Sequence, residues 1–140
     1  MKRFYKYDSE ANKAEYLIHD HQNVYKGEAY CHPEDKEFAS QQTGLMIAQT
    51  RAQIACFKAK RKESKIKFKT LSDFHKSLLG TKKYDVDSYC EHRFNKELEI
   101  LKEEIEIYDD MVKSLTLYLG EYLNQREEYY QKYRKNKGED

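Results

Sequence analysis

The clearest pattern in the chain is a seam of hydrophobic residues that recur at alternating spacings of four and three. It runs from Phe94 to Tyr133, and only Arg126 interrupts it. This spacing is typical of the contact face of a coiled-coil helix, so we predict one long helix over about residues 88–134. Its two core positions hold Leu98, Leu101, Ile105, Tyr108, Val112, Leu115, Leu119 and Tyr122.

The seam does not by itself identify the surface that covers it. A second copy of the chain, the helices of residues 40–80 and another protein all fit the pattern. Ile100 and Ile107 form a shorter apolar line on another face of the same helix. We therefore expect the first half of this helix to pack on two sides.

The first 32 residues have the alternation of β-strands. In residues 23–31 one face carries Tyr25, Gly27, Ala29 and Cys31, and the other carries Val24, Lys26, Glu28 and Tyr30. Residues 8–13 have turn chemistry, and residues 14–20 fit either a strand or a helix. We predict two or three antiparallel strands, the last of which ends at Pro33 because proline cannot donate to a ladder.

A helix is predicted at about residues 40–62, with Ser40 or Thr43 as its cap. Small residues form one stripe along it, and they let the helix approach closely whatever it packs on: Leu45, Ala48, Ala52, Ala55 and Ala59. A short helix that ends at Gly80 should follow.

These elements predict an α+β fold with a small N-terminal antiparallel sheet, packing helices and a long C-terminal helix with a heptad seam. The predicted organisation has four parts. They are a sheet-plus-helix module (1–62), a basic segment with a short helix and loop (63–87), the long helix (88–134) and a tail (135–140).

Composition narrows the function classes. Charged residues make up 36% of the 140 residues, but the net charge is only +1, so the chain as a whole lacks the basic excess of a general nucleic-acid binder. Three cysteines do not suit a disulfide framework and favour a reducing compartment. The N-terminus has no signal-peptide pattern and no segment is long and apolar enough for a membrane, so we expect a cytosolic protein.

Seven acidic residues crowd residues 97–110, and some of them are like charges four residues apart, which is unfavourable in a helix. Three interpretations are open: a solvated face, pairing with the basic residues of 58–69, or imitation of phosphate toward a cationic groove on a partner. The third interpretation makes a binding face of Glu99, Glu103, Glu106 and Asp110.

The basic run itself offers a rival site. It contains seven Lys or Arg, with Phe57 and Phe68 beside them, and nucleic acid could bind to Lys58, Lys60, Arg61, Lys62, Lys65, Lys67 and Lys69. The alternative, without a binding function, is a helix whose lysines face water.

Cysteine and histidine pairs suggest little chemistry. His19 and His21, Cys31 and His32, and Cys90 and His92 do not have the spacing of zinc ligands. The chain also lacks a nucleophile elbow and a glycine-rich phosphate loop. We expect the cysteines to be small apolar fillers, and we predict no enzyme activity, no metal and no cofactor.

One stretch has a recognisable pattern. Residues 27–35 read G-x-A-x-C-x-P-x-D, followed by Phe38, Gly44, Ile47–Ala48 and Arg51–Ala52. This pattern resembles small uncharacterised proteins of phages and mobile elements in Gram-positive bacteria, over about residues 1–60. The resemblance implies a strand that passes through a proline turn into a helix, in a module shaped broadly like a double-stranded-RNA-binding domain, and it implies no catalytic residues.

The resulting hypothesis is a phage-type accessory protein that binds and inhibits a host nucleic-acid-processing or defence complex, in the manner of an anti-CRISPR protein. The alternatives are a nucleic-acid-binding module that uses residues 58–69 and a structural homodimer joined along the seam.

Overall fold

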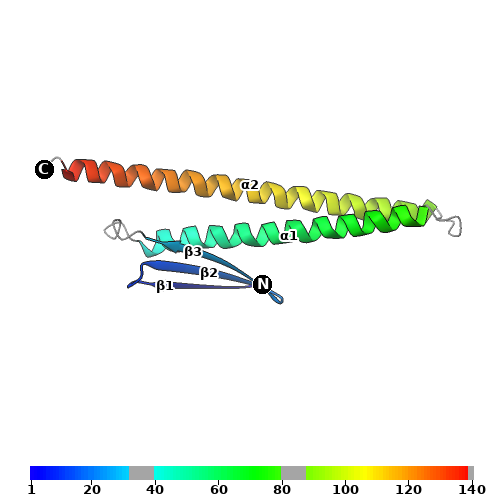
Figure 1. Ribbon diagram of the computed structural model, residues 1–140, viewed down its shortest axis with the longest axis horizontal. Helices are drawn as coiled ribbons and strands as arrows, with labels where there is room; N and C mark the ends of the chain where they lie inside the picture. Colours follow the sequence, from blue (N-terminus) through cyan, green and yellow to red (C-terminus); the bar gives the residue numbers. More distant parts are fainter. Residues whose placement is uncertain (32–39, 80–87, 139–140) are drawn as a thin grey trace. The chain divides into compact units, whose positions relative to one another are not determined.

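The computed structural model describes residues 1–31, 40–79 and 88–138. Its elements are β1 (Lys2–Asp8), β2 (Lys13–Asp20), β3 (Asn23–Tyr30), α1 (Gln41–Leu79) and α2 (Ser88–Gly138). Over these residues the chain has the predicted α+β fold, in which one antiparallel sheet of three strands is followed by two helices (Figure 1). Within the described part of the chain, neither helix has a stretch that is apolar and long enough to cross a membrane.

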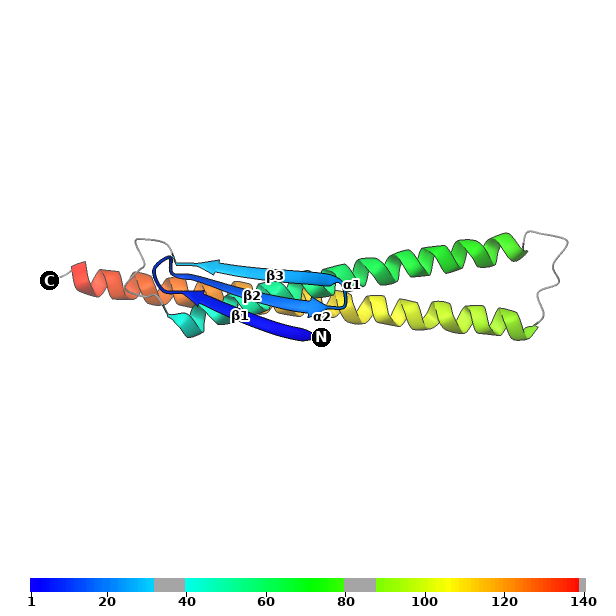
Figure 2. The same ribbon diagram turned by 90° about the horizontal axis from the view of Figure 1, so that it is seen from below.

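The sheet is a meander in which β2 lies between β1 and β3 (Figure 2). In the first turn, the backbone N–H of Glu10 donates to the Asp8 carboxylate at 3.0 Å, as the turn chemistry of this segment predicts. In the second turn, His21 takes a left-handed φ of 55°. The sequence of residues 14–20 is compatible with either a strand or a helix. In the structure this segment belongs to β2, the central strand of the sheet.

The alternation along β3 separates a buried face from an exposed one. Gly27 and Ala29 are buried, whereas Val24 and Tyr30, on the other face, are 53% and 64% exposed. The two faces predicted for residues 23–31 are therefore confirmed.

Helix α1 begins where the sequence predicts, and Ser40 is its cap. The Thr43 N–H donates to the Ser40 hydroxyl oxygen at 3.3 Å, and the Gly44 N–H donates to the Ser40 carbonyl at 2.9 Å. The end predicted near residue 62 is wrong, because α1 continues to Leu79 and takes in both the basic run and the predicted short helix. Lysine, arginine and glutamate are good helix formers, and neither glycine nor proline interrupts this stretch.

By its backbone contacts the chain forms two compact units. Unit 1 comprises residues 1–56 and 112–140, and unit 2 comprises residues 57–111. Within unit 1, the N-terminal part of α1 lies between the sheet and the C-terminal part of α2 (Figure 1). Within unit 2, the rest of α1 and the first part of α2 run side by side in opposite directions (Figures 1 and 2).

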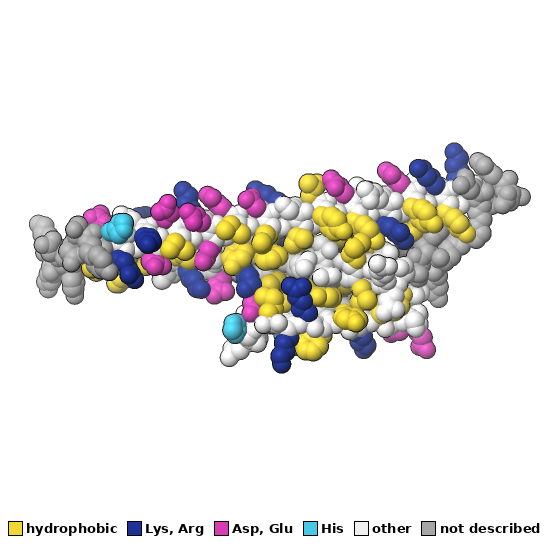
Figure 3. Space-filling model, turned by 180° about the vertical axis from the view of Figure 1, so that it is seen from behind, with side chains coloured by type: hydrophobic (Ala, Val, Ile, Leu, Met, Phe, Trp, Pro, Cys, Tyr) yellow, Lys and Arg dark blue, Asp and Glu magenta, His cyan; other side chains and the backbone are white. Residues whose placement is uncertain are grey.

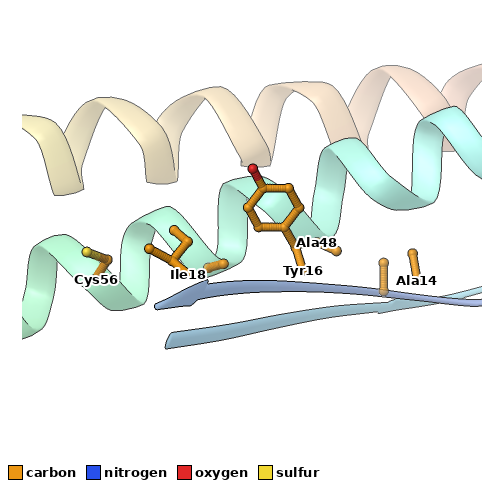
Figure 4. Packing of buried hydrophobic residues seen from close by; sticks show 7 residues of the cluster. Ala14, Tyr16, Ile18, Ala48 and Cys56 are labelled. Carbon is orange, nitrogen blue, oxygen red and sulfur yellow. The ribbon is translucent and has the colours of Figure 1, made fainter. Parts of the chain in front are cut away.

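The hydrophobic core of unit 1 lies between the sheet and α1 (Figure 4). Tyr16 and Ile18 point from β2 toward the helix, with 9% and 2% of their surface exposed. The helix presents small side chains in return, and Ala48 and Ala52 are fully buried. Cys56 continues this stripe as a buried apolar filler, as predicted.

Gly27 brings α1 unusually close to the sheet. It pairs with Tyr16 in the ladder, and a Cβ built on it would lie 2.5 Å from the Ala52 nitrogen and nearer still to the Ala48 carbonyl oxygen. Real Cβ atoms essentially never come so close to backbone. The helix backbone therefore occupies the space that any other residue at position 27 would fill.

Several predicted features lie outside the described residues. They are the proline turn with Pro33, Asp35 and Phe38, the helix end at Gly80 and the loop of residues 81–87.

Replacing Gly27 with alanine is expected to lower the free energy of unfolding by about 1–3 kcal/mol, the usual cost of overpacking a close-packed core. Urea unfolding followed by circular dichroism measures the change. Gly120→Ala is the matched control, because a Cβ there meets nothing within 4 Å and alanine in a helix interior is favoured over glycine by about 1 kcal/mol. A Gly27→Ala variant as stable as the original chain would contradict the close approach of the α1 backbone to Gly27.

Candidate functional site

The acidic residues of α2 in unit 2 fall into two groups, and the first group faces α1. Asp109 and Glu104 are half-buried. The Asp109 carboxylate accepts a hydrogen bond from the Arg61 guanidinium at 2.7 Å. The Ser64 hydroxyl, which is buried, donates to the Glu104 carboxylate at 3.4 Å. These two acids therefore bind side chains of residues 58–69 within unit 2.

The second group points to solvent. It includes the four acids predicted to form a binding face, Glu99, Glu103, Glu106 and Asp110, and all four are exposed. Their spacings of four, three and four place them on one face of the helix. The structure gives none of them an ion pair with another described residue. Figure 3 shows acidic side chains gathered over the N-terminal part of α2.

An exposed apolar line runs along α2 beside the acidic face. Ile100, Ile107 and Met111 are 40%, 53% and 41% exposed, and their spacing puts them on one side of the helix. The second packing side expected for this helix is not covered by the described part of the chain, so a partner for it stays a prediction. The face predicted to bind a partner thus has carboxylates with aliphatic side chains next to them.

The heptad seam lies against α1 of the same chain. In unit 2, Tyr108 stacks on Phe57 with ring centroids 6.2 Å apart, and Phe94 stacks on the buried His75 at 4.8 Å. The eight predicted core positions are Leu98, Leu101, Ile105, Tyr108, Val112, Leu115, Leu119 and Tyr122. Seven of them are half-buried, and Val112 is buried with 6% of its surface exposed.

The same holds for the part of the seam that belongs to unit 1. The Tyr122 hydroxyl donates to the Thr43 hydroxyl oxygen at 3.4 Å, and the Tyr118 hydroxyl lies 3.6 Å from the Met46 sulfur. Of the three surfaces that fit the seam by its sequence, the structure thus places α1 of the same chain on it. Past Arg126 the seam positions Tyr129 and Tyr133 are exposed.

The basic run divides in a similar way. Arg61 faces α2, Lys60 is half-buried, and Lys67 binds Glu63 at 3.1 Å. The remaining lysines are exposed, and their spacings of four, three and four put them on one side of α1: Lys58, Lys62, Lys65 and Lys69.

The three cysteines have three different environments. Cys56 is buried, Cys31 is half-buried at the end of β3, and Cys90 is exposed, so the expectation of an apolar filler is wrong for Cys90. Burial raises the pKa of the Cys31 thiol, which keeps it protonated at neutral pH. Among the described residues, no group of three or more His, Cys, Asp or Glu side chains is placed to hold a metal ion.

Unit 1 also contains a pocket of about 430 Å³ that the sequence did not predict. It lies where the end of the sheet, the first turns of α1 and the C-terminal part of α2 meet. The described residues that line it are Tyr7, Asn12, Ala29, Tyr30, Cys31, Ser40, Thr43, Gly44, Ile47, Leu123, Asn124, Arg126, Glu127 and Tyr130.

Arg126, the one polar break in the heptad seam, lines this pocket. Its guanidinium carbon lies 5.6 Å from the ring centroid of Tyr129 and 5.3 Å from that of Tyr130. Interaction with the Tyr130 hydroxyl raises the pKa of Arg126 further above its ordinary value. The side chain therefore carries a positive charge into the pocket at any working pH.

Comparison with models of protein families, with curated proteins and with solved structures finds no match to this chain.

The Arg61–Asp109 pair should contribute more to stability than an exposed ion pair. The two side chains are 25% and 34% exposed, and we expect a double-mutant cycle with Arg61→Ala and Asp109→Ala to give a coupling of about 1 kcal/mol. The matched control is Glu63–Lys67, a pair four residues apart whose side chains are 63% and 62% exposed. Its coupling should be about 0.3–0.5 kcal/mol. A coupling for Arg61–Asp109 no larger than that of the control would show that the internal pairing is unimportant.

Proposed function

We propose that this protein acts by binding a partner protein, without catalysis and without a cofactor, through the exposed acidic face of α2. The face consists of Glu99, Glu103, Glu106 and Asp110, together with the neighbouring apolar line. The partner would present a basic surface that ordinarily holds nucleic acid, and the four carboxylates would occupy the positions of phosphate groups.

The observation that carries this proposal is the division of the acids on α2. Asp109 and Glu104 bind Arg61 and Ser64, and so their presence has a structural explanation. The four exposed acids have no such partner among the described residues, and two of their pairs are like charges four residues apart, each of which costs a few tenths of a kcal/mol in a helix. These four acids do not stabilise the fold through ion pairs among the described residues, but they would contribute to binding a cationic surface on a partner.

The exposed apolar line adds the second component of a protein-binding surface. Stable interfaces combine an apolar centre with a polar rim, and Ile100, Ile107 and Met111 lie beside the carboxylates. The carboxylates would also speed association with a basic partner by electrostatic steering, so the association rate should fall steeply as salt is added.

The resemblance of residues 1–60 to phage and mobile-element proteins narrows the class of partner. We propose a host defence or nucleic-acid-processing complex in the cytosol of a Gram-positive bacterium, with a CRISPR effector as the concrete case. Occupying its nucleic-acid groove would inhibit the complex.

A capture experiment in the host lysate tests the proposal. Tagged protein, the double variant Glu103→Lys/Glu106→Lys and the control Glu121→Lys/Glu128→Lys are each used to capture complexes after nuclease treatment. The control makes the same change in net charge at exposed residues of α2 in unit 1. We expect the original chain and the control to retain a nucleic-acid-processing complex, and the variant in the acidic face to lose at least about nine-tenths of it, as expected when several interface charges are reversed.

Inhibition is then measured directly on the complex that is captured. The original chain and the control should suppress its cleavage or binding of nucleic acid, and the Glu103→Lys/Glu106→Lys variant should not. Equal capture by all three chains would remove the acidic face from the function, and capture only of proteins that do not handle nucleic acid would reject the class of partner.

The exposed lysines of α1 favour a second candidate, a nucleic-acid-binding module. Lys58, Lys62, Lys65 and Lys69 share one side of the helix and could follow a phosphate backbone. Fluorescence anisotropy with plain DNA and RNA at low salt tests it. This candidate predicts binding that weakens with salt and is lost on Lys62→Glu/Lys65→Glu, and it is rejected if neither nucleic acid binds.

A further inference from the structure

We propose that the pocket of unit 1 is a binding site for a small molecule that carries one carboxylate on an apolar body, with Arg126 as the residue that recognises the carboxylate. The site is distinct from the acidic face, which belongs to unit 2, and the inference does not depend on the function proposed above.

The buried part of Arg126 is the first argument. Its Nε is shielded from solvent and makes no hydrogen bond to any described residue. A buried donor without an acceptor is unfavourable by about 1–3 kcal/mol, and native proteins rarely leave one. The side chain also lines the pocket, so a carboxylate bound there would supply acceptors to the accessible part of the same guanidinium.

The charge of Arg126 is the second argument. Aromatic rings of Tyr129 and Tyr130 flank the guanidinium, and no described carboxylate forms an ion pair with it. Glu127, the acidic residue among the described lining residues, accepts a hydrogen bond from Gln131 at 3.3 Å instead. The pocket therefore has one positive charge that the protein itself does not neutralise within the described residues.

The start of α1 reinforces the preference for an anion. Ser40, Thr43 and Gly44 line the pocket, and the first turn of the helix contains no acidic residue. Backbone N–H groups at a helix N-terminus favour negative charge. The N–H groups of Thr43 and Gly44 are already bonded to Ser40, so they favour an anion here through the helix dipole. This dipole adds to the charge of Arg126, which lines the same pocket.

The rest of the lining favours a ligand whose remaining part is apolar. Ala29, Ile47 and Leu123 are apolar, and the tyrosine rings are flat. A volume of about 430 Å³ is in the range of pockets for small molecules. Among the described residues the lining has a single arginine and no lysine, which suits a carboxylate with one negative charge better than a phosphate with two. The planar fork of arginine also matches the geometry of a carboxylate.

Nuclear magnetic resonance titration of the full chain tests the site. The probes are benzoate, phenylacetate and hexanoate, each compared with its neutral amide and with phenyl phosphate. We expect at least one carboxylate to shift the Arg126 Nε–H resonance and the amide resonances of Thr43 and Gly44. Its neutral amide should bind about tenfold more weakly or worse, because a hydrogen bond to a charged group is lost.

Two variants make the test specific. Arg126→Gln should weaken binding of the carboxylate about tenfold or more, whereas Arg134→Gln, the same change at an exposed position of α2, should leave it unchanged. Circular dichroism of each variant confirms that the fold is retained. Arg126→Lys keeps the charge but not the fork, so its affinity should be intermediate.

Three results would overturn the proposal. The first is that no carboxylate perturbs the pocket resonances. The second is that the neutral amide or phenyl phosphate binds as tightly as the carboxylate. The third is that Arg126→Gln binds as well as the original chain, or that Arg134→Gln loses as much affinity.

Discussion

The close contact between Gly27 and the backbone of α1 is the constraint on which the rest of unit 1 depends. Because position 27 has no side chain, the helix can rest on β3 with Ala48 and Ala52 against the sheet. Only small residues on the helix permit this distance, so the glycine and the alanine stripe require one another. The contact fixes both the height of the helix over the sheet and its rotation.

That placement determines what the other face of α1 can do. With its small residues turned to the sheet, α1 presents Thr43 and Met46 to α2. Its first turn then lies beside the end of the sheet and Arg126, and the pocket forms there. A helix held farther from the sheet by larger side chains would leave these groups differently arranged.

In unit 2 the organising feature is the distribution of charge. Arg61 and Ser64 bind Asp109 and Glu104 between the two helices, while the four acids of the acidic face and the four lysines on one side of α1 are exposed. Exposed ion pairs contribute about 0–1 kcal/mol, and exposed like charges reduce stability. The outer acids therefore do not stabilise the fold through ion pairs among the described residues, and this is the basis for our proposal that they bind a partner.

Much of this architecture can be predicted from the sequence, because it follows from the local periodicity of hydrophobic residues. Alternation along residues 23–31 predicts the faces of β3, and the heptad spacing predicts α2. The sequence predicts too short an α1, because its lysine-rich run lacks the continuous apolar face that indicates a helix. The residues of this run nevertheless have high helix propensity. The apolar line of Ile100 and Ile107 predicts a second packing side, and in the described part of the chain it is exposed. The pocket unites residues far apart in the chain, so local periodicity does not predict it.

Carboxylate footprinting by mass spectrometry, on the protein free and bound to its captured partner, tests the central claim most directly. Each Glu and Asp is labelled in proportion to its accessibility, and Glu104 and Asp109 serve as internal references because they already face α1. The account predicts that Glu99, Glu103, Glu106 and Asp110 lose most of their labelling in the complex. If these four remain as reactive in the complex as in the free protein while other parts of the chain become protected, the acidic face is not the binding surface.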